Sequence, residues 1–122
     1  MNFTPGDTLF FKDHLCVVIS DPAQDPNRVV VVAFTTRESW TDEGCVLYPG
    51  DHPFIQHDTC IDYAFFNPCL TLGHLQNAIS SKMASRRQPV SRNVLDRIYR
   101  GVDESRDIPT GHANLLCSQG LI

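Results

Sequence analysis

The sequence predicts a mainly β, α+β fold in which a small antiparallel β-barrel or sandwich is followed by C-terminal helices. Three observations support this class. Residues 28–36, RVVVVAFTT, form a short β-branched segment that is apolar on both faces, which is typical of a buried central strand. Other short apolar segments recur about every ten residues up to residue 70, with turn residues between them. Beyond that point the apolar residues take the spacing of helices.

The valine-rich strand needs cover on both of its faces. Side chains alternate in direction along an extended chain, so the four valines from Val29 to Val32 point to both sides of the sheet. Burying a large apolar side chain contributes roughly 1.5–3 kcal/mol relative to leaving it in water. We therefore expect the rest of the chain to pack against this strand from both sides.

Four further strands are expected around it. Each is a short apolar segment bounded by residues that favour turns, beginning with Pro5-Gly6-Asp7 before the first strand. The polar segments 21–27 and 37–44 are predicted to be loops. These strands are predicted at residues 8–12, 15–20, 45–48 and 59–65.

The first helix is predicted to begin after Thr71, which is a suitable N-cap, and to be broken by residues 85–89. Its expected apolar face, with helical spacing, comprises Leu72, Leu75, Ile79 and Met83.

A second helix is expected after Ser91, again a suitable N-cap, and Gly101 is expected to weaken its end. Leu115 and Leu116 predict a last helical turn. The apolar face of the second helix is expected to comprise Val94, Leu95, Ile98 and Val102.

The composition predicts a single domain. A chain of 122 residues with 42% hydrophobic content is expected to fold around one core, over residues 1–122 with the barrel in 1–70 and the helical extension in 71–122. No apolar run approaches the ~18 residues of a membrane span, and the N-terminus lacks the features of a signal peptide. We therefore expect a cytoplasmic protein that does not enter a membrane. Five cysteines without a CxxC pair are expected to be reduced, with Cys16, Cys45 and Cys60 as small buried residues.

Charge and missing motifs exclude several functions. The formal net charge of −4 argues against a stand-alone nucleic-acid binder with a broad basic surface. The sequence contains no P-loop, GxGxxG, GxSxG or HExxH motif. Positive charge is concentrated late in the chain, where the cluster of Lys82, Arg86, Arg87 and Arg92 is expected to be a solvated face between helices, with nucleic-acid contact as the alternative.

The segment 50–62, GDHPFIQHDTCID, holds the candidate catalytic residues His52, His57 and Asp58. A histidine beside a carboxylate can transfer protons near neutral pH, because the carboxylate orients the ring and supports its charged form. Alternatively, the aspartates cap turns and the histidines are ordinary surface groups. A metal site would need His52, His57 and a third ligand, such as Asp58 or Cys60, to converge; the spacing matches no known site, and we expect no cofactor.

Candidate binding residues lie at the end of the central strand. The hydroxyl groups of Thr35 and Thr36 and the guanidinium of Arg37 suit phosphate contacts. Alternatively, the threonines are present only because threonine has a high β-propensity. Trp40 follows in an acidic loop. It is expected to fold back as a lid on the sheet, and the alternative is an exposed anchor for a partner or a base.

Residues 4–66 resemble the PemK/MazF-like toxins. The resemblance rests on a proline-glycine-aspartate turn, a strand ending in serine, a valine-rich strand ending in threonine, and a later strand that opens after a threonine. These features are carried by residues 5–7, 17–20, 29–36, 45–47 and 58–62.

This resemblance implies an SH3-like β-barrel, usually a homodimer. It implies a metal-independent endoribonuclease that cuts single-stranded RNA through attack by the 2′-hydroxyl and is neutralised by an antitoxin protein. Thr35 or Thr36 would match the family's threonine after the central strand, and Asp62 would lie near its acidic position. His14 would stand in the first interstrand loop, where some members use a histidine.

Two functions are therefore predicted. The first is a toxin of a toxin–antitoxin or phage-defence system, acting as an endoribonuclease, and the histidine–carboxylate segment favours it. The second is a non-catalytic SH3-like adaptor whose groove and Trp40 hold a protein partner. The acidic charge favours this adaptor, as does Ala64-Phe65-Phe66 where the family places an arginine.

Overall fold

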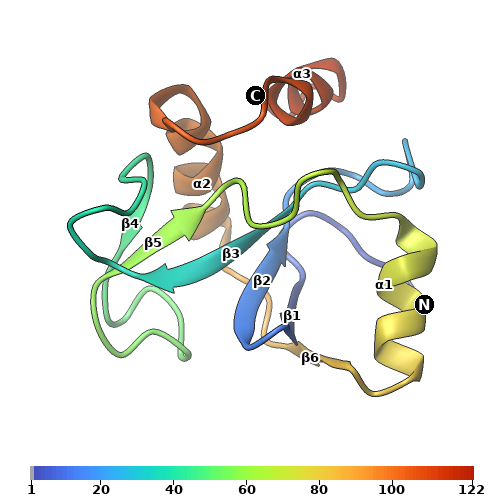
Figure 1. The fold of residues 1–122 in the computed structure, drawn as a ribbon, viewed down its shortest axis with the longest axis horizontal. Helices are drawn as coiled ribbons and strands as arrows, with labels where there is room; N and C mark the ends of the chain where they lie inside the picture. Colours follow the sequence, from blue (N-terminus) through green and yellow to red (C-terminus); the bar gives the residue numbers. More distant parts are fainter. Residues whose placement is uncertain (1) are drawn as a thin grey trace.

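The structure, a computed structural model that describes residues 2–122, has a six-stranded antiparallel sheet with three helices (Figure 1). The α+β class is therefore confirmed, with an antiparallel sheet at its centre and helices after residue 70 as expected. The strands are β1 (Thr8–Phe11), β2 (His14–Val18), β3 (Val31–Thr36), β4 (Val46–Leu47), β5 (Thr59–Asp62) and β6 (Ala84–Arg87). The helices are α1 (Leu72–Ser80), α2 (Arg92–Glu104) and α3 (Thr110–Ser118).

The strands lie in the order β4-β5-β3-β2-β1-β6. Strands β4 and β6 form the two edges, and within the described residues they are not paired with each other, so the sheet is open rather than a closed barrel. The predicted strands are all present, although most are shorter than expected. The central strand begins at Val31, because Val29 makes an isolated bridge to Leu70 outside the main sheet.

Strand β3 is central, as predicted, and it is covered on both faces. Its side chains alternate between two hydrophobic clusters, one that includes helices α2 and α3 and one that includes α1. Figure 1 shows α1 on the opposite side of the sheet from α2 and α3. Val30, Val32 and Phe34 belong to the first cluster, and Val29, Val31 and Ala33 belong to the second.

Helix α1 starts as predicted, because the Thr71 hydroxyl accepts a hydrogen bond from the backbone N–H of His74 at 3.0 Å. The expected extension to Met83 is wrong. The helix ends at Ser80, Lys82 takes a left-handed conformation with φ of 64°, and Met83 is exposed.

The segment predicted to separate two helices forms strand β6 instead. It pairs along its whole length with β1, from Phe11 opposite Ala84 to Thr8 opposite Arg87. Only Ala84 in this strand is buried. An edge strand with one buried side chain lacks the alternating pattern that marks a strand in a sequence.

Helix α2 begins as predicted, with the Ser91 hydroxyl accepting from the Val94 N–H at 3.1 Å. Two buried tyrosine hydroxyls tie it to the sheet. Tyr63 donates to the Ile98 carbonyl oxygen at 2.6 Å, and Tyr99 donates to that of Ile19 at 2.8 Å. The third helix is longer than the single turn predicted from its leucines. No helix in residues 2–122 combines the length and the apolar character needed to cross a membrane.

Candidate functional site

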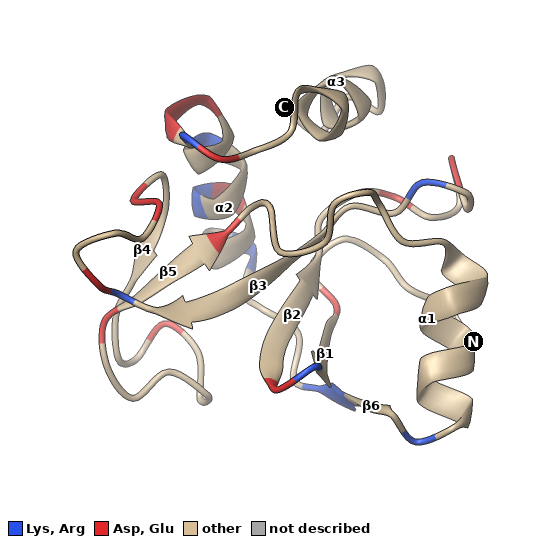
Figure 2. Cartoon of the chain, in the orientation of Figure 1, with Lys and Arg blue, Asp and Glu red and all other residues tan. Residues whose placement is uncertain are grey.

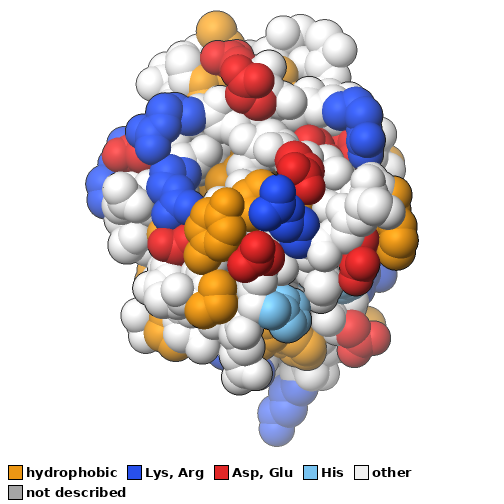
Figure 3. Space-filling model, turned by 90° about the vertical axis from the view of Figure 1, so that its left-hand side faces the viewer, with side chains coloured by type: hydrophobic (Ala, Val, Ile, Leu, Met, Phe, Trp, Pro, Cys, Tyr) orange, Lys and Arg blue, Asp and Glu red, His pale blue; other side chains and the backbone are white. Residues whose placement is uncertain are grey.

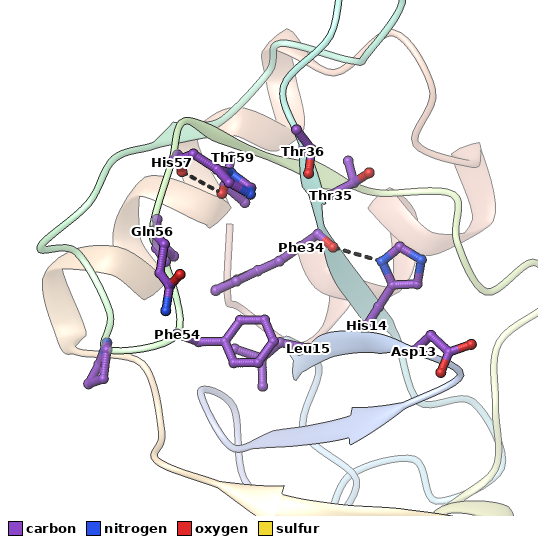
Figure 4. Close-up of a pocket in the computed structure, with 12 residues that line it drawn as sticks. Asp13, His14, Leu15, Phe34, Thr35, Thr36, Phe54, Gln56, His57 and Thr59 are labelled. Carbon is purple, nitrogen blue, oxygen red and sulfur yellow. Dashed lines mark hydrogen bonds between the residues drawn. The ribbon is translucent and has the colours of Figure 1, made fainter.

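A pocket of about 530 Å³ opens where β2, β3 and the loop before β5 meet (Figure 4). Leu15 and Phe34 supply apolar walls. Polar groups surround them, including two histidines and three threonines. These polar residues are Asp13, His14, Thr35, Thr36, Gln56, His57 and Thr59.

His14, the first residue of β2, is fixed by the backbone of the neighbouring strand. Its Nδ1 lies 3.0 Å from the Phe34 carbonyl oxygen, and the ring packs on Phe65 with centroids 4.7 Å apart. A carbonyl oxygen can only accept, so Nδ1 carries the proton in the neutral ring. The other nitrogen, Nε2, is then the one that can accept a proton from a substrate.

His57 lies on another side of the same pocket and is exposed to solvent. Its Nδ1 is 3.3 Å from the Asp58 carbonyl oxygen, and the Thr59 hydroxyl donates to the His57 carbonyl at 2.9 Å (Figure 4). The expected pairing of the His57 ring with the Asp58 carboxylate is not formed. That carboxylate instead faces Arg37, at 3.5 Å.

His52 does not line this pocket. It is buried, its Nε2 donates to the Gln88 carbonyl oxygen at 2.7 Å, and its Nδ1 accepts from the Phe54 N–H at 3.1 Å. Both ring nitrogens are therefore used by the backbone, and the ring joins the loop before β5 to the segment after β6. The structure thus separates His52 from His57.

Arg37 follows Thr36 directly but points into an ion-pair group outside the pocket lining. Its guanidinium binds both oxygens of Glu43, at 3.0 and 3.1 Å, in addition to Asp58. Hydrogen bonds and charge from Glu43 raise the pKa of Arg37, and Arg37 in turn lowers the pKa of Glu43. A phosphate would have to compete with the carboxylates of Glu43 and Asp58 for this guanidinium.

Trp40 and Asp62 lie together at a second, smaller hollow of about 160 Å³ that Asp42 and Asp107 also line. The prediction that Trp40 folds back as a lid is wrong, because 70% of this residue is exposed. Figure 3 shows hydrophobic side chains at the surface among charged ones on this side of the molecule. Thr35 lines both hollows and separates the Trp40 side from the histidine side.

Asp42 is a buried carboxylate that the sequence analysis did not single out. It accepts hydrogen bonds from the Ser105 hydroxyl and from the backbone N–H groups of Gly44, Arg106 and Asp107. These bonds attach the loop carrying Trp40 to the end of α2. An aspartate two residues before a glycine is a common turn signal, but nothing nearby in the sequence indicates its distant partners.

The four residues of the predicted basic cluster, which include Lys82, are exposed as expected, but they are divided between residues 82–87, which include β6, and the start of α2. Arg86 and Arg87 lie on β6, and Arg92 pairs with Asp96 on α2 at 3.0 Å. Arg86 binds Asp7 at 3.1 Å. Within the described residues Arg87 forms no ion pair with a carboxylate.

The cysteines are free, and Cys16, Cys45 and Cys60 are buried as predicted. Burial raises the pKa of the Cys16 thiol to about 12 and that of Cys45 to about 11. These thiols therefore stay protonated near neutral pH and are poor nucleophiles. Across residues 2–122 no three His, Cys, Asp or Glu side chains are grouped so that they could hold a metal ion.

Comparison with known proteins gives no match to a family model, a curated protein or a solved structure. The open α+β sheet and the pocket that holds His14 and His57 are therefore the features from which a function can be inferred.

Proposed function

We propose that this protein is a metal-independent endoribonuclease that cleaves single-stranded RNA in the pocket between His14 and His57. One observation carries the proposal: His14 and His57, which come from different segments, line one pocket together with Thr35 and Thr36. Two proton-transfer groups in a pocket that can hold a phosphate are what cleavage by an internal 2′-hydroxyl requires.

In this mechanism His14 is the general base. Its Nδ1–H is held by the Phe34 carbonyl, which leaves Nε2 to take the proton from the ribose 2′-hydroxyl. The 2′-oxygen attacks phosphorus, forming the O2′–P bond while the P–O5′ bond breaks. The products carry a 2′,3′-cyclic phosphate and a 5′-hydroxyl.

His57 is the general acid. Because it is exposed, it can take up a proton from solvent and deliver it to the departing O5′. No lysine or arginine among residues 2–122 lines the pocket, so the protonated ring must also offset the charge that develops on the phosphoryl oxygens. The hydroxyls of Thr35 and Thr36 can donate hydrogen bonds to those oxygens.

The resemblance to PemK/MazF-like toxins extends the proposal to architecture and partners. The antiparallel sheet would be the core of an SH3-like barrel, and the active protein would be a homodimer in the cytoplasm. An antitoxin protein would neutralise it within a toxin–antitoxin or phage-defence system. The resemblance, which first pointed to His14, and the pocket that His14 shares with His57 support the same reaction.

Cleavage of a fluorescent single-stranded RNA by the purified protein in EDTA tests the proposal. We expect His14→Ala and His57→Ala each to lower the rate about 10²- to 10⁴-fold, the usual contribution of a general acid or base. His74→Ala is the matched control, because His74 is an exposed histidine on α1, which packs on the other face of the sheet. Equal rates for all three folded variants would refute the assignment.

A second candidate is the non-catalytic adaptor, which the exposure of Trp40 favours. This ring projects beside a hollow lined by Asp42, Asp62 and Asp107, and an exposed aromatic anchor is typical of protein interfaces. The adaptor predicts that Trp40→Ala abolishes capture of a protein partner while the chain shows no RNA cleavage at any pH from about 5 to 8.

A further inference from the structure

Two aromatic rings, the exposed Phe54 and the half-buried Phe10, extend the histidine pocket along the sheet. Phe54 lines the pocket, and 46% of it is exposed (Figure 4). Its ring lies 6.0 Å from that of Phe10 on β1, with the two planes tilted by 46°. Apolar rings beside a polar pocket are a surface on which a flat ligand can stack.

A free positive charge stands at the far end of this pair. The Arg87 guanidinium lies 5.6 Å from the centroid of the Phe10 ring. It donates to the Ser85 hydroxyl and the Arg86 carbonyl, and it meets no carboxylate in the described part of the chain. Its charge is thus available to an anion, unlike that of Arg86, which Asp7 neutralises.

The surface beyond Thr36, outside the pocket lining, carries a net negative charge. There Thr36 leads into Arg37, whose single positive charge is shared by the carboxylates of Glu43 and Asp58. Figure 2 shows acidic residues in the loops beside β4 and β5, and basic residues along β6 at the other edge of the sheet. The chain of a bound polyanion is therefore expected to extend from the pocket toward β6.

We propose that Phe54, Phe10 and Arg87 form a ledge that binds the nucleotide adjoining the cleaved phosphate. A base stacks on Phe54 against the Phe10 edge, and the next phosphate binds Arg87. The strand must be single, because bases in a duplex are stacked on one another and cannot lie on a protein ring. The identity of this strand as RNA rests on the proposed function.

Binding can be measured without cleavage, by fluorescence anisotropy of a labelled RNA decamer in the His57→Ala background. We expect Phe54→Ala to weaken binding about 5- to 100-fold, as loss of one stacked base does. Arg87→Ala is expected to reduce the slope of log K against log salt by about 0.7, the value for one phosphate contact on a single strand. A hairpin RNA without unpaired bases is expected to bind more weakly than the decamer.

The controls match the two residues. Tyr48 is exposed to the same extent as Phe54, 46%, and Arg100 is exposed on α2; neither lines the histidine pocket. Tyr48→Ala and Arg100→Ala are expected to leave binding and its salt slope unchanged. If they weaken binding as much as the ledge variants do, or if the hairpin binds as tightly as the decamer, the ledge is refuted.

The ledge and the proposed reaction can fail separately. RNA binding that Phe54→Ala and Arg87→Ala weaken, in a protein that cuts no RNA, supports the ledge and overturns the nuclease. Cleavage that needs His14 and His57, with decamer binding unchanged in both ledge variants, supports the nuclease and overturns the ledge.

Discussion

His14 and His52 hold their ring protons on opposite nitrogens. His14 Nδ1 faces a carbonyl oxygen at 3.0 Å and must donate, whereas His52 Nδ1 faces the Phe54 N–H at 3.1 Å and must accept. His52 then donates from Nε2 to the Gln88 carbonyl at 2.7 Å. The backbone thus leaves an accepting nitrogen on His14 and none on His52. Of these two histidines, therefore, only His14 is assigned a chemical role.

The first prediction concerns these tautomers. Long-range ¹⁵N–¹H correlation spectra at a pH where the rings are neutral are expected to show Nδ1–H for His14 and Nε2–H for His52. The two spin systems are assigned by their loss in His14→Asn and His52→Asn. An Nε2–H tautomer for His14 would contradict the proposed direction of its proton transfer.

The second prediction is that His52 stabilises the fold and does not act on substrate. His52→Ala removes two hydrogen bonds and leaves the Phe54 N–H without its partner, whereas the Gln88 carbonyl keeps its hydrogen bond from the Thr8 hydroxyl. We therefore expect the free energy of unfolding to fall by about 1–3 kcal/mol. Urea titration measures this loss. RNA cleavage per folded molecule is expected to stay within about threefold of wild type, and a loss as large as that of His57→Ala would reinstate His52 as catalytic.

The third prediction concerns the contact between α2 and the loop before β4. A Cβ on Gly101 would lie 2.7 Å from the Gly44 carbonyl oxygen and would also strike the Tyr63 hydroxyl. Neither atom can move away easily, because the Gly44 oxygen is part of the backbone and the Tyr63 hydroxyl is hydrogen bonded to the Ile98 carbonyl. We therefore expect Gly101→Ala to destabilise the protein by about 3 kcal/mol or more in a thermal or urea unfolding measurement.

Gly111 provides the control for this substitution. It also lies in a helix, but a Cβ there meets nothing within 4 Å. Gly111→Ala is expected to stabilise the protein by about 0.4–1 kcal/mol, because alanine restricts the unfolded chain. Similar effects of the two substitutions would show that the close approach of α2 to Gly44 is absent.

The fourth prediction is a pH dependence that arises at His112 in α3. This histidine is buried, its Nδ1 has no hydrogen-bond partner in residues 2–122, and burial lowers its pKa below the ordinary value of 6.5. The unfolded chain therefore binds the proton more readily than the folded protein. The stability that His112 contributes is complete above pH 6.5 and is lost as the pH falls below that value.

Substitution by leucine separates this effect from that of the other histidines. We expect His112→Leu to gain stability relative to wild type as the pH is lowered from about 7 to about 5, because leucine cannot bind the proton that favours the unfolded wild-type chain. Chemical denaturation across this pH range measures it. Parallel curves for the two proteins would mean that His112 is not buried in its neutral form.

The sequence predicts those parts of the fold that depend on local pattern. The two-faced valine strand and the N-caps Thr71 and Ser91 are found where expected, because alternation and capping are properties of neighbouring residues. Strand β6 was missed because it depends on pairing with β1, more than 70 residues away in the chain, and only one of its side chains is buried.

The candidate site was predictable only in part, for the same reason. His57, Thr35 and Thr36 were singled out from the sequence and do line one pocket. The burial of His52 depends on Gln88, 36 residues away, and the orientation of Asp58 depends on Arg37. His14 entered only through the family resemblance, because a lone histidine at a turn carries no signal of the carbonyl that orients it.

The chemical ends of the RNA products show directly whether the ribose 2′-hydroxyl attacks the phosphate. We expect wild-type protein in EDTA to yield a 5′-hydroxyl and a 2′,3′-cyclic phosphate, identified by mass spectrometry. We also expect an RNA with 2′-deoxyribose at the cleaved position to stay intact. Products with a 5′-phosphate, or cleavage of the deoxy-substituted strand, would contradict attack by the 2′-hydroxyl in the His14–His57 pocket.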